Sequence, residues 1–211
     1  MQGKEAQADR QSTAESLQAE VRPRGRPAAA SREDVLDAGL YRYLRGERVD
    51  VQAIAAELGL GRATIYRWFG SREKLLGEVI IRATEPVLAK ARSGLAGKGG
   101  PGLLDTFDRF NRALADAPAL QTFLDQERDA ALRIIATAGG PVQPRIVELI
   151  TGLITDEVEA GTYEAPVDPT TLGYAIVKLA QAFLFNDAVA GIRGDVDRLR
   201  EVEAALLGVA A

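Results

Sequence analysis

The stretch that decides the fold is VQAIAAELGLGRATIYRWFGSREKLL, residues 51–76. Apolar side chains recur at helical spacing in two short segments, one over 51–58 and one from Arg62 to Trp68 or Phe69. Gly59-Leu60-Gly61 separates them, and a tight glycine-containing turn lets two helices cross at a steep angle. The stretch therefore predicts a helix-turn-helix, whose second helix can enter the major groove of DNA.

The second of these helices carries side chains that suit DNA. Arg62 and Arg67 can each read a guanine edge with two hydrogen bonds. The hydroxyl groups of Thr64 and Tyr66 suit phosphate oxygens. On an isolated short helix the same four side chains would be an ordinary solvated face, and the longer pattern around them favours DNA.

That longer pattern is AAELG at 55–59 followed by TIYRWFGSREKLL at 64–76. It resembles the DNA-binding domain of TetR-family transcriptional regulators, and the resemblance covers about residues 31–80. The resemblance implies an all-α protein with a three-helix N-terminal helix-turn-helix domain and a helical ligand-binding and dimerisation domain. It also implies a homodimer that a small-molecule effector releases from a palindromic double-stranded DNA operator.

The resemblance assigns DNA contacts position by position. Base or near-base contacts are implied for Arg62, Ala63, Thr64 and Arg67. Phosphate contacts are implied for Tyr66 and Arg72, and a phosphate or base contact for Val51 and Gln52. Trp68 stands where many relatives have His, so its indole either lies on the DNA backbone or fills the edge of the core.

Residues 1–30 show no helical or strand periodicity and few large apolar side chains, which predicts a disordered arm. The arm contains PRGRP at 23–27, which resembles the core of an AT-hook. Arg24 and Arg26 would then enter a narrow A·T-rich minor groove beside the operator. The alternative is an inert, solvated linker.

The charge distribution supports the same division of the chain. The net charge is −4, but residues 21–74 carry 11 Lys+Arg against 7 Asp+Glu, whereas residues 75–211 carry 13 against 19. We therefore expect a basic DNA-binding domain over 31–76 and an acidic effector-binding and dimerisation domain over 77–211. The acidic domain discourages DNA contact elsewhere.

The remainder of the chain is expected to be helical, because no segment alternates with the period of a strand. GKGGPG at 97–102 is expected to be a loop, and one helical segment is expected from Pro118 to Thr137. Apolar periodicity also predicts a helix that ends at Gly161, one from Asp168 to about Ala190, and a final one through Val196 and Leu206.

Aromatic residues, and polar residues inside apolar helices, are the candidates for a ligand pocket. They are Phe107, Phe110, Phe123, Leu149, Leu153, Tyr174, Lys178, Phe185 and Asn186. Core packing is the alternative for each aromatic, and pairing with a carboxylate is the alternative for Lys178. The candidates for the dimer interface, some of which the core would also suit, are Leu172, Ile176, Leu179, Phe183, Val196, Leu199, Val202 and Leu206. A hydrophobic or amphipathic effector would fit such a pocket.

Composition excludes several classes of chemistry. The chain has no His and no Cys, so disulfides, Cys/His zinc sites and Ser-His-Asp triads are excluded. Neighbouring carboxylates such as Asp156 and Glu157 do not converge on a helix, so no enzyme, metal or cofactor is expected. The N-terminus lacks the apolar segment of a secretory signal and no spanning segment is visible, which predicts a cytoplasmic protein without membrane contact. The alternative to a ligand-responsive repressor is an architectural DNA-binding protein without an effector.

Overall fold

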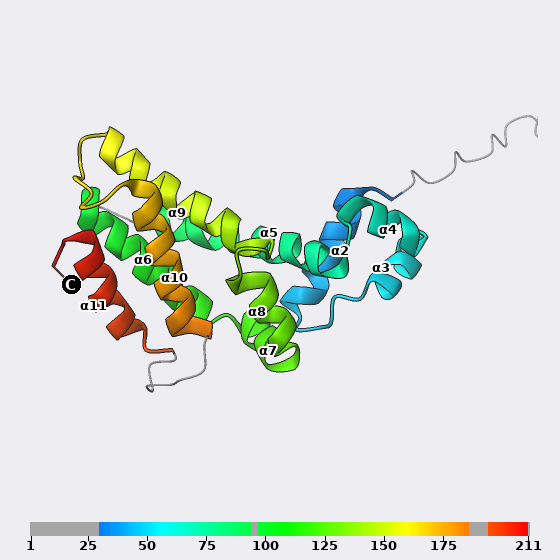
Figure 1. Cartoon of the computed structure of the whole chain (residues 1–211). Coiled ribbons are helices and arrows are strands. Elements are labelled where there is room, and N and C mark those ends of the chain that lie inside the picture. Colours follow the sequence, from blue (N-terminus) through cyan, green and yellow to red (C-terminus); the bar gives the residue numbers. More distant parts are fainter. Residues whose placement is uncertain (1–29, 94–96, 186–193, 211) are drawn as a thin grey trace, which may run out of the picture. The chain divides into compact units, whose positions relative to one another are not determined.

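The computed structural model describes residues 30–93, 97–185 and 194–210. Within these ranges every regular element is a helix and there is no strand, which confirms the predicted all-α fold (Figure 1). The helices are α2 (Arg32–Leu44), α3 (Val51–Glu57), α4 (Arg62–Phe69), α5 (Arg72–Ser93), α6 (Gly99–Ala115), α7 (Pro118–Gln126), α8 (Arg128–Ala136), α9 (Val142–Glu159), α10 (Pro169–Phe185) and α11 (Val196–Leu207). The predicted contact residues Arg24, Arg26 and Asn186 lie outside the described ranges.

Local chemistry sets the bounds of the two short helices. The Asp50 carboxylate accepts hydrogen bonds from the backbone nitrogens of Gln52, at 2.6 Å, and Ala53, at 2.9 Å. These bonds satisfy donors that the first turn of α3 would otherwise leave without partners. Gly59, with φ of 64°, then turns the chain between α3 and α4 in a left-handed conformation that glycine adopts without strain.

One hydrophobic core, which we call the head core, joins the helix-turn-helix to the helices beyond it. It takes side chains from α2, α3, α4 and the first half of α5, from α7 and α8, and also from the start of α9 and the end of α10. Its most deeply buried members include Val35, Ile54, Ile65, Leu75, Leu76, Val79, Ala131 and Ile134. The helix-turn-helix is therefore packed on the same apolar interior as α7 and α8.

A second core, which we call the body core, lies among the later helices. It takes side chains from the second half of α5 and from α6, α9, α10 and α11, including Leu88, Leu103, Phe107, Ile154, Leu172 and Leu207. Because α5 contributes to both cores, it connects the helix-turn-helix to the rest of the unit Arg32–Ala211 (Figure 1). In the described ranges, none of the helices combines the length and apolar character that crossing a membrane requires.

Two predicted boundaries were wrong. The expected loop over 97–102 ends early, because α6 begins at Gly99, whose N–H donates to Glu157 Oε2 of α9 at 2.6 Å. The segment expected to be continuous from Pro118 to Thr137 is broken at Glu127, where φ is −133° and ψ is 46°. The helix expected to reach Ala190 is described as far as Phe185. The division between residues 76 and 77 falls inside α5 and stays a prediction.

Candidate nucleic-acid interface and ligand cavity

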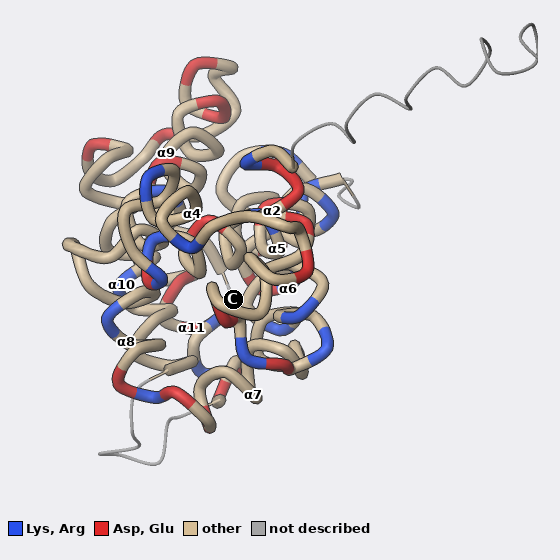
Figure 2. The backbone as a smooth tube through the Cα atoms, turned by 90° about the vertical axis from the view of Figure 1, so that its right-hand side faces the viewer, with Lys and Arg blue, Asp and Glu red and all other residues tan. Residues whose placement is uncertain are grey.

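Helix α4 turns an apolar side to the head core and a polar side outward. Ile65 and Phe69 are buried, whereas Arg62, Tyr66 and Arg67 are exposed. Ala63 is also exposed and Thr64 is half-buried. Figure 2 looks onto the end of the molecule that carries α3 and α4, with Lys and Arg in blue. The four polar side chains predicted for DNA therefore lie on one helix, where Arg62, Tyr66 and Arg67 are exposed and Thr64 is half-buried.

Arg62 and Arg67 differ from neighbouring arginines in their partners. Arg42 pairs with Glu57 at 2.6 Å, and Arg45 pairs with Glu47 at 2.8 Å. Neither Arg62 nor Arg67 has an ion-pair partner within the described ranges. An exposed guanidinium group with no carboxylate beside it is available to a phosphate or a guanine edge.

The three other residues predicted to contact DNA near α4 differ in their exposure. Val51 is buried in the head core, and only 4% of the whole residue is exposed. Gln52, beside it, is exposed. Trp68 is half-buried against the head core, which is the core-edge alternative of the two considered for it. The DNA-contact roles of these residues stay predictions.

Arg72 is held by protein groups at the start of α5. Its Nε donates to the backbone oxygen of Val49 at 2.7 Å, and its two terminal nitrogens donate to the Glu127 carboxylate, each at 2.7 Å. The hydrogen bond from Arg72, with further attraction from Arg48 at 3.6 Å, lowers the pKa of the Glu127 carboxyl. The phosphate contact predicted for Arg72 stays a prediction, and a phosphate would compete there with Glu127.

A cavity of about 60 Å³ lies among the helices from α5 to α11. Its lining residues are Ile80, Thr84, Phe107, Phe110, Asn111, Leu114, Leu120, Ile135, Val142, Ile146, Ile150, Ile176, Val177, Ala180, Gln181, Leu184, Phe185 and Glu203. Most of these side chains are aliphatic or aromatic, and a mostly apolar wall with a few polar groups is typical of small-molecule sites.

The structure brings three of the predicted pocket residues to this cavity, namely Phe107, Phe110 and Phe185. Four others lie elsewhere. Phe123 packs edge-on against Tyr43 in the head core, with ring centroids 6.3 Å apart. Leu149 and Leu153 line a separate surface groove between α5 and α9, and Tyr174 is about half exposed.

Lys178, also predicted for the pocket, ties α10 to neighbouring helices. Its Nζ donates to the backbone oxygen of Ala136 at 3.0 Å, to Gln143 Oε1 at 2.8 Å and to Gln181 Oε1 at 3.2 Å. No carboxylate pairs with Lys178 within the described ranges. Its role here is to satisfy carbonyl groups at the junction of α8, α9 and α10.

Sequence reasoning missed the two most informative polar residues of the cavity wall, Asn111 and Glu203. Glu203 is fully buried; its Oε1 accepts a hydrogen bond from Asn111 Nδ2 at 2.9 Å, and its Oε2 has no partner within the described ranges. Burial raises the pKa of the Glu203 carboxyl to about 8. The signal was present, because Glu203 stands four residues from both Leu199 and Leu207, in the middle of an apolar stripe.

The predicted dimer residues separate into two groups. Leu172, Ile176, Phe183 and Leu199 are buried within the single chain. Leu179, Val196 and Leu206 are half-buried, and Val202 is exposed on α11. Tyr174 of α10, which was predicted for the pocket, is also exposed. A partner chain would therefore meet the second group, while the first group packs inside the protomer. The interface itself stays a prediction.

Comparison with known proteins gives two family matches. Residues 47–79 match the model described as bacterial regulatory proteins, tetR family, and residues 98–208 match the model described as tetracyclin repressor-like, C-terminal domain. No curated protein matches the chain.

Two of the solved structures that are similar to this chain are TetR-family repressors. The transcriptional repressor QsdR of R. erythropolis, from the TetR family, is 29% identical, and the match covers 85% of this chain and 95% of that chain with a TM-score of 0.78. The TetR-family repressor AlkX of Dietzia sp. strain DQ12-45-1b, implicated in biodegradation of n-alkanes, is 21% identical. That match covers 85% of this chain and 96% of that chain with a TM-score of 0.58.

Proposed function

The chain belongs to the TetR family of bacterial transcriptional regulators, and from that premise we propose that it is a repressor released from its operator by a small apolar effector. The observation that carries DNA binding is the pair Arg62 and Arg67, exposed on α4 and without ion-pair partners in the described part of the chain. Repression, as opposed to activation, is supported by the likeness to QsdR, which is a repressor.

We infer that α4 enters the major groove. Its first and last turns carry Arg62 and Arg67, so both can reach base edges while Tyr66 reaches a phosphate oxygen. A protein that carries one such helix per chain reads a palindrome as a dimer, with half-sites about one helical turn apart. The exposed Tyr174 and Val202 on α10 and α11 support a homodimer built on these helices.

We infer that the effector occupies the cavity among α5 to α11. Ile80 and Thr84 of α5 form part of its wall, and α5 continues from the helix-turn-helix. The cavity measures about 60 Å³, and on the same measure one water molecule needs roughly 10–15 Å³. The cavity is therefore too small for a drug-sized effector unless the side chains and helices that line it move apart. Displacement of α5 would change the distance between the two α4 helices of the dimer, so that they no longer match the spacing of the two operator half-sites.

The test begins with selection of binding sites from a random DNA pool by the purified full-length protein. The expected result is a palindromic motif. Arg62→Ala is expected to weaken binding to that motif at least about tenfold, as loss of a bidentate base contact does. Arg109→Ala, which removes an exposed arginine on α6, outside the proposed dimer helices, is the matched control and should bind as the parent does.

The second arm of the test adds an extract of the cells that produce the protein to the protein–operator complex. Release of the operator supports an effector-controlled regulator. Selection without any recovered motif, together with binding that spreads along DNA, would instead support the architectural DNA-binding protein considered above. The predicted cytoplasmic location stays part of the proposal.

A further inference from the structure

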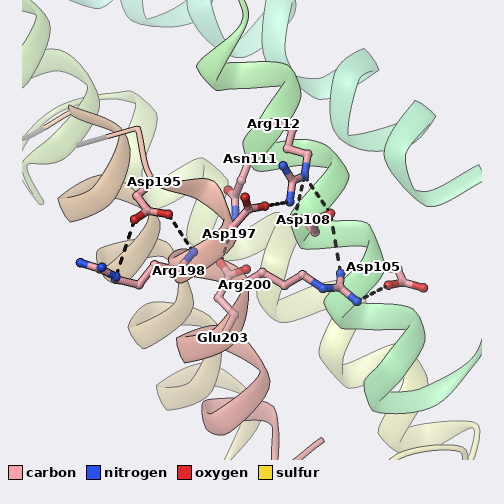
Figure 3. Close-up of polar contacts among 9 residues, drawn as sticks. All are labelled: Asp105, Asp108, Asn111, Arg112, Asp195, Asp197, Arg198, Arg200 and Glu203. Atoms are coloured by element: carbon pink, nitrogen blue, oxygen red, sulfur yellow. Dashed lines mark hydrogen bonds and ion pairs between the residues drawn. The ribbon is translucent and has the colours of Figure 1, made fainter. Parts of the chain in front are cut away.

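The cavity has a polar end, and that end is incomplete. Glu203 of α11 faces Asn111 of α6 (Figure 3), and both side chains line the cavity. Asn111 Nδ2 donates to Glu203 Oε1 at 2.9 Å, while the fully buried Oε2 has no hydrogen-bond partner within the described ranges. Buried polar atoms are nearly always paired in folded proteins, so an unpaired oxygen in the wall of a cavity points to a missing ligand group.

The charged groups around Glu203 do not offer it a cation. On α6, Asp108 opposes its ionisation, and on its own helix Arg200 favours it. Arg200, however, is already engaged with Asp105 at 2.9 Å and Asp108 at 3.7 Å (Figure 3). On α10, the ammonium group of Lys178 is taken by carbonyl oxygens of α8, α9 and α10. A carboxyl group buried without a cation is held in its neutral form.

We propose that Glu203 is held as the neutral acid and donates its O–H to a carbonyl oxygen of an uncharged, otherwise apolar ligand. Because Oε1 already accepts from Asn111, the proton belongs on Oε2, the oxygen left without a partner. The aliphatic and aromatic remainder of the wall would take the hydrocarbon part of the ligand. This proposal rests on the proposed function, in which the cavity receives an effector.

The chemistry separates this ligand class from two others. An ammonium ligand would need Glu203 as an anion, so its binding would release a proton. A carboxylate ligand would compete for the same proton and would add negative charge near Asp108. A ketone, ester, lactone or amide needs neither change, since its carbonyl oxygen only accepts a hydrogen bond.

The experiment measures direct binding to the full-length protein without DNA, by titration calorimetry. The probes are 2-octanone, octan-2-amine and octanoate, which offer a neutral acceptor, a cation and an anion on chains of equal carbon number. The variants are Glu203→Gln, which keeps a neutral donor and an acceptor, and Glu203→Leu, which keeps only the approximate volume. Glu201→Gln, on the exposed side of the same helix, is the matched control.

For the parent at about pH 6, 2-octanone should bind at least about tenfold more tightly than either charged probe, and its affinity should fall about tenfold by about pH 9. Glu203→Gln should keep the affinity within about threefold at both pH values, whereas Glu203→Leu should lose about tenfold. The infrared carbonyl stretch of bound 2-octanone should lie lower in the parent than in Glu203→Leu. Glu201→Gln should behave as the parent does.

Tighter binding of octan-2-amine than of 2-octanone, abolished by Glu203→Gln, would show that Glu203 is a counter-ion and overturn the proposal. Equal binding of 2-octanone to the parent and to Glu203→Leu would also overturn it, as would no saturable binding up to the solubility of 2-octanone. None of these three results would affect the proposed function if another compound released the protein from its operator, so failure of this proposal and failure of the proposed function are distinguishable.

Discussion

The guanidinium group of Arg72 and the carboxylate of Glu127 are joined by two hydrogen bonds of 2.7 Å, although the residues stand 55 positions apart. Arg72 is the first residue of α5, directly after the helix-turn-helix, and Glu127 joins α7 to α8. Leu120 of α7 and Ile135 of α8 both line the cavity. The ion pair therefore connects the start of α5 to helices that form part of the cavity wall.

We expect Glu127→Gln to lower the free energy of unfolding by about 1–3 kcal/mol, because a largely buried Arg72 loses its charged partner. The folded pKa of Glu127 lies below its ordinary value, so the pair stabilises the parent fully above the unfolded pKa of 4.5. That stabilisation is lost as the pH falls through the folded pKa. Urea unfolding at neutral and at acid pH measures both effects.

The control for this prediction is Asp197→Asn, which removes one of the two carboxylate partners of Arg112 in an exposed ion pair. Exposed pairs contribute little, so the unfolding midpoint in urea should hardly change. If Glu127→Gln and Asp197→Asn lowered the free energy of unfolding equally, the Arg72–Glu127 pair would stabilise the fold no more than an exposed ion pair does.

Glu203 should make stability fall with rising pH. Its folded pKa of about 8 exceeds the ordinary value of 4.5, so the folded state binds more protons between these values. Its contribution is therefore fully present below about pH 4.5 and is lost as the pH rises through about 8. In Glu203→Gln this dependence should disappear, whereas Glu201→Gln should keep it. Urea midpoints across the range provide the measurement, and parallel curves for the two variants would contradict the prediction.

Arg67→Ala and Tyr66→Phe should weaken DNA binding in different ways. Loss of a bidentate contact to a base costs about 1–3 kcal/mol of discrimination, so Arg67→Ala should relax the preference at one position of each half-site. Tyr66→Phe should weaken binding to all sequences about equally, because a phosphate contact carries no sequence information. Repeated site selection compares the two. If Arg67→Ala recovered the parental motif at parental affinity, Arg67 would not read a base.

Gly77 of α5 packs so closely against Pro141 that a larger residue does not fit at this position. A Cβ atom at Gly77 of α5 would lie 2.0 Å from Pro141 Cγ and 2.7 Å from Pro141 Cβ. We expect Gly77→Ala to destabilise the fold by about 1–3 kcal/mol, since α5 or the start of α9 must shift. Gly152→Ala is the control, because a Cβ there meets nothing within 4 Å and alanine favours a helix by up to about 1 kcal/mol. In thermal unfolding, the melting temperature should fall for Gly77→Ala and rise for Gly152→Ala.

Deletion of residues 1–30 should lower both the affinity for DNA and its dependence on salt. Arg24 and Arg26 in the predicted arm would each neutralise one phosphate, so for a dimer with two arms the slope of log K against log salt should become shallower by about 4. Fluorescence anisotropy of labelled operator at several salt concentrations gives the slope. The double substitution Arg24→Ala and Arg26→Ala should reproduce most of the change; an unaltered slope in both would mean that the arm is a linker.

Local signals were enough to predict the helix-turn-helix. Asp50 caps α3, Gly59 turns the chain, and the predicted helix from Arg62 to Trp68 or Phe69 is α4. Each of these features depends on residues within a few positions of one another. The family match over residues 47–79 agrees with the resemblance seen in the same stretch.

The errors all involve contacts between distant residues. No Gly or Pro marks the break at Glu127, whose carboxylate instead pairs with Arg72. The early start of α6 at Gly99 depends on a hydrogen bond to Glu157, 58 positions away. Glu203 and Asn111, 92 positions apart, were overlooked because only the folded chain brings them together. Leu149 and Tyr174 have plausible pocket chemistry but face other surfaces.

The composition of the head core has consequences for thermal unfolding, for truncated fragments of the chain and for sequence change in α4. Because the side chains that support α4 pack with those of α7 and α8, residues 31–76 lack a complete interior when separated from the remainder. The described chain should melt in one cooperative transition, and a fragment that ends at residue 76 should not hold its shape. A different DNA specificity can be introduced by changing the exposed side chains of α4, but Ile65 and Phe69 must be kept because they pack in the head core.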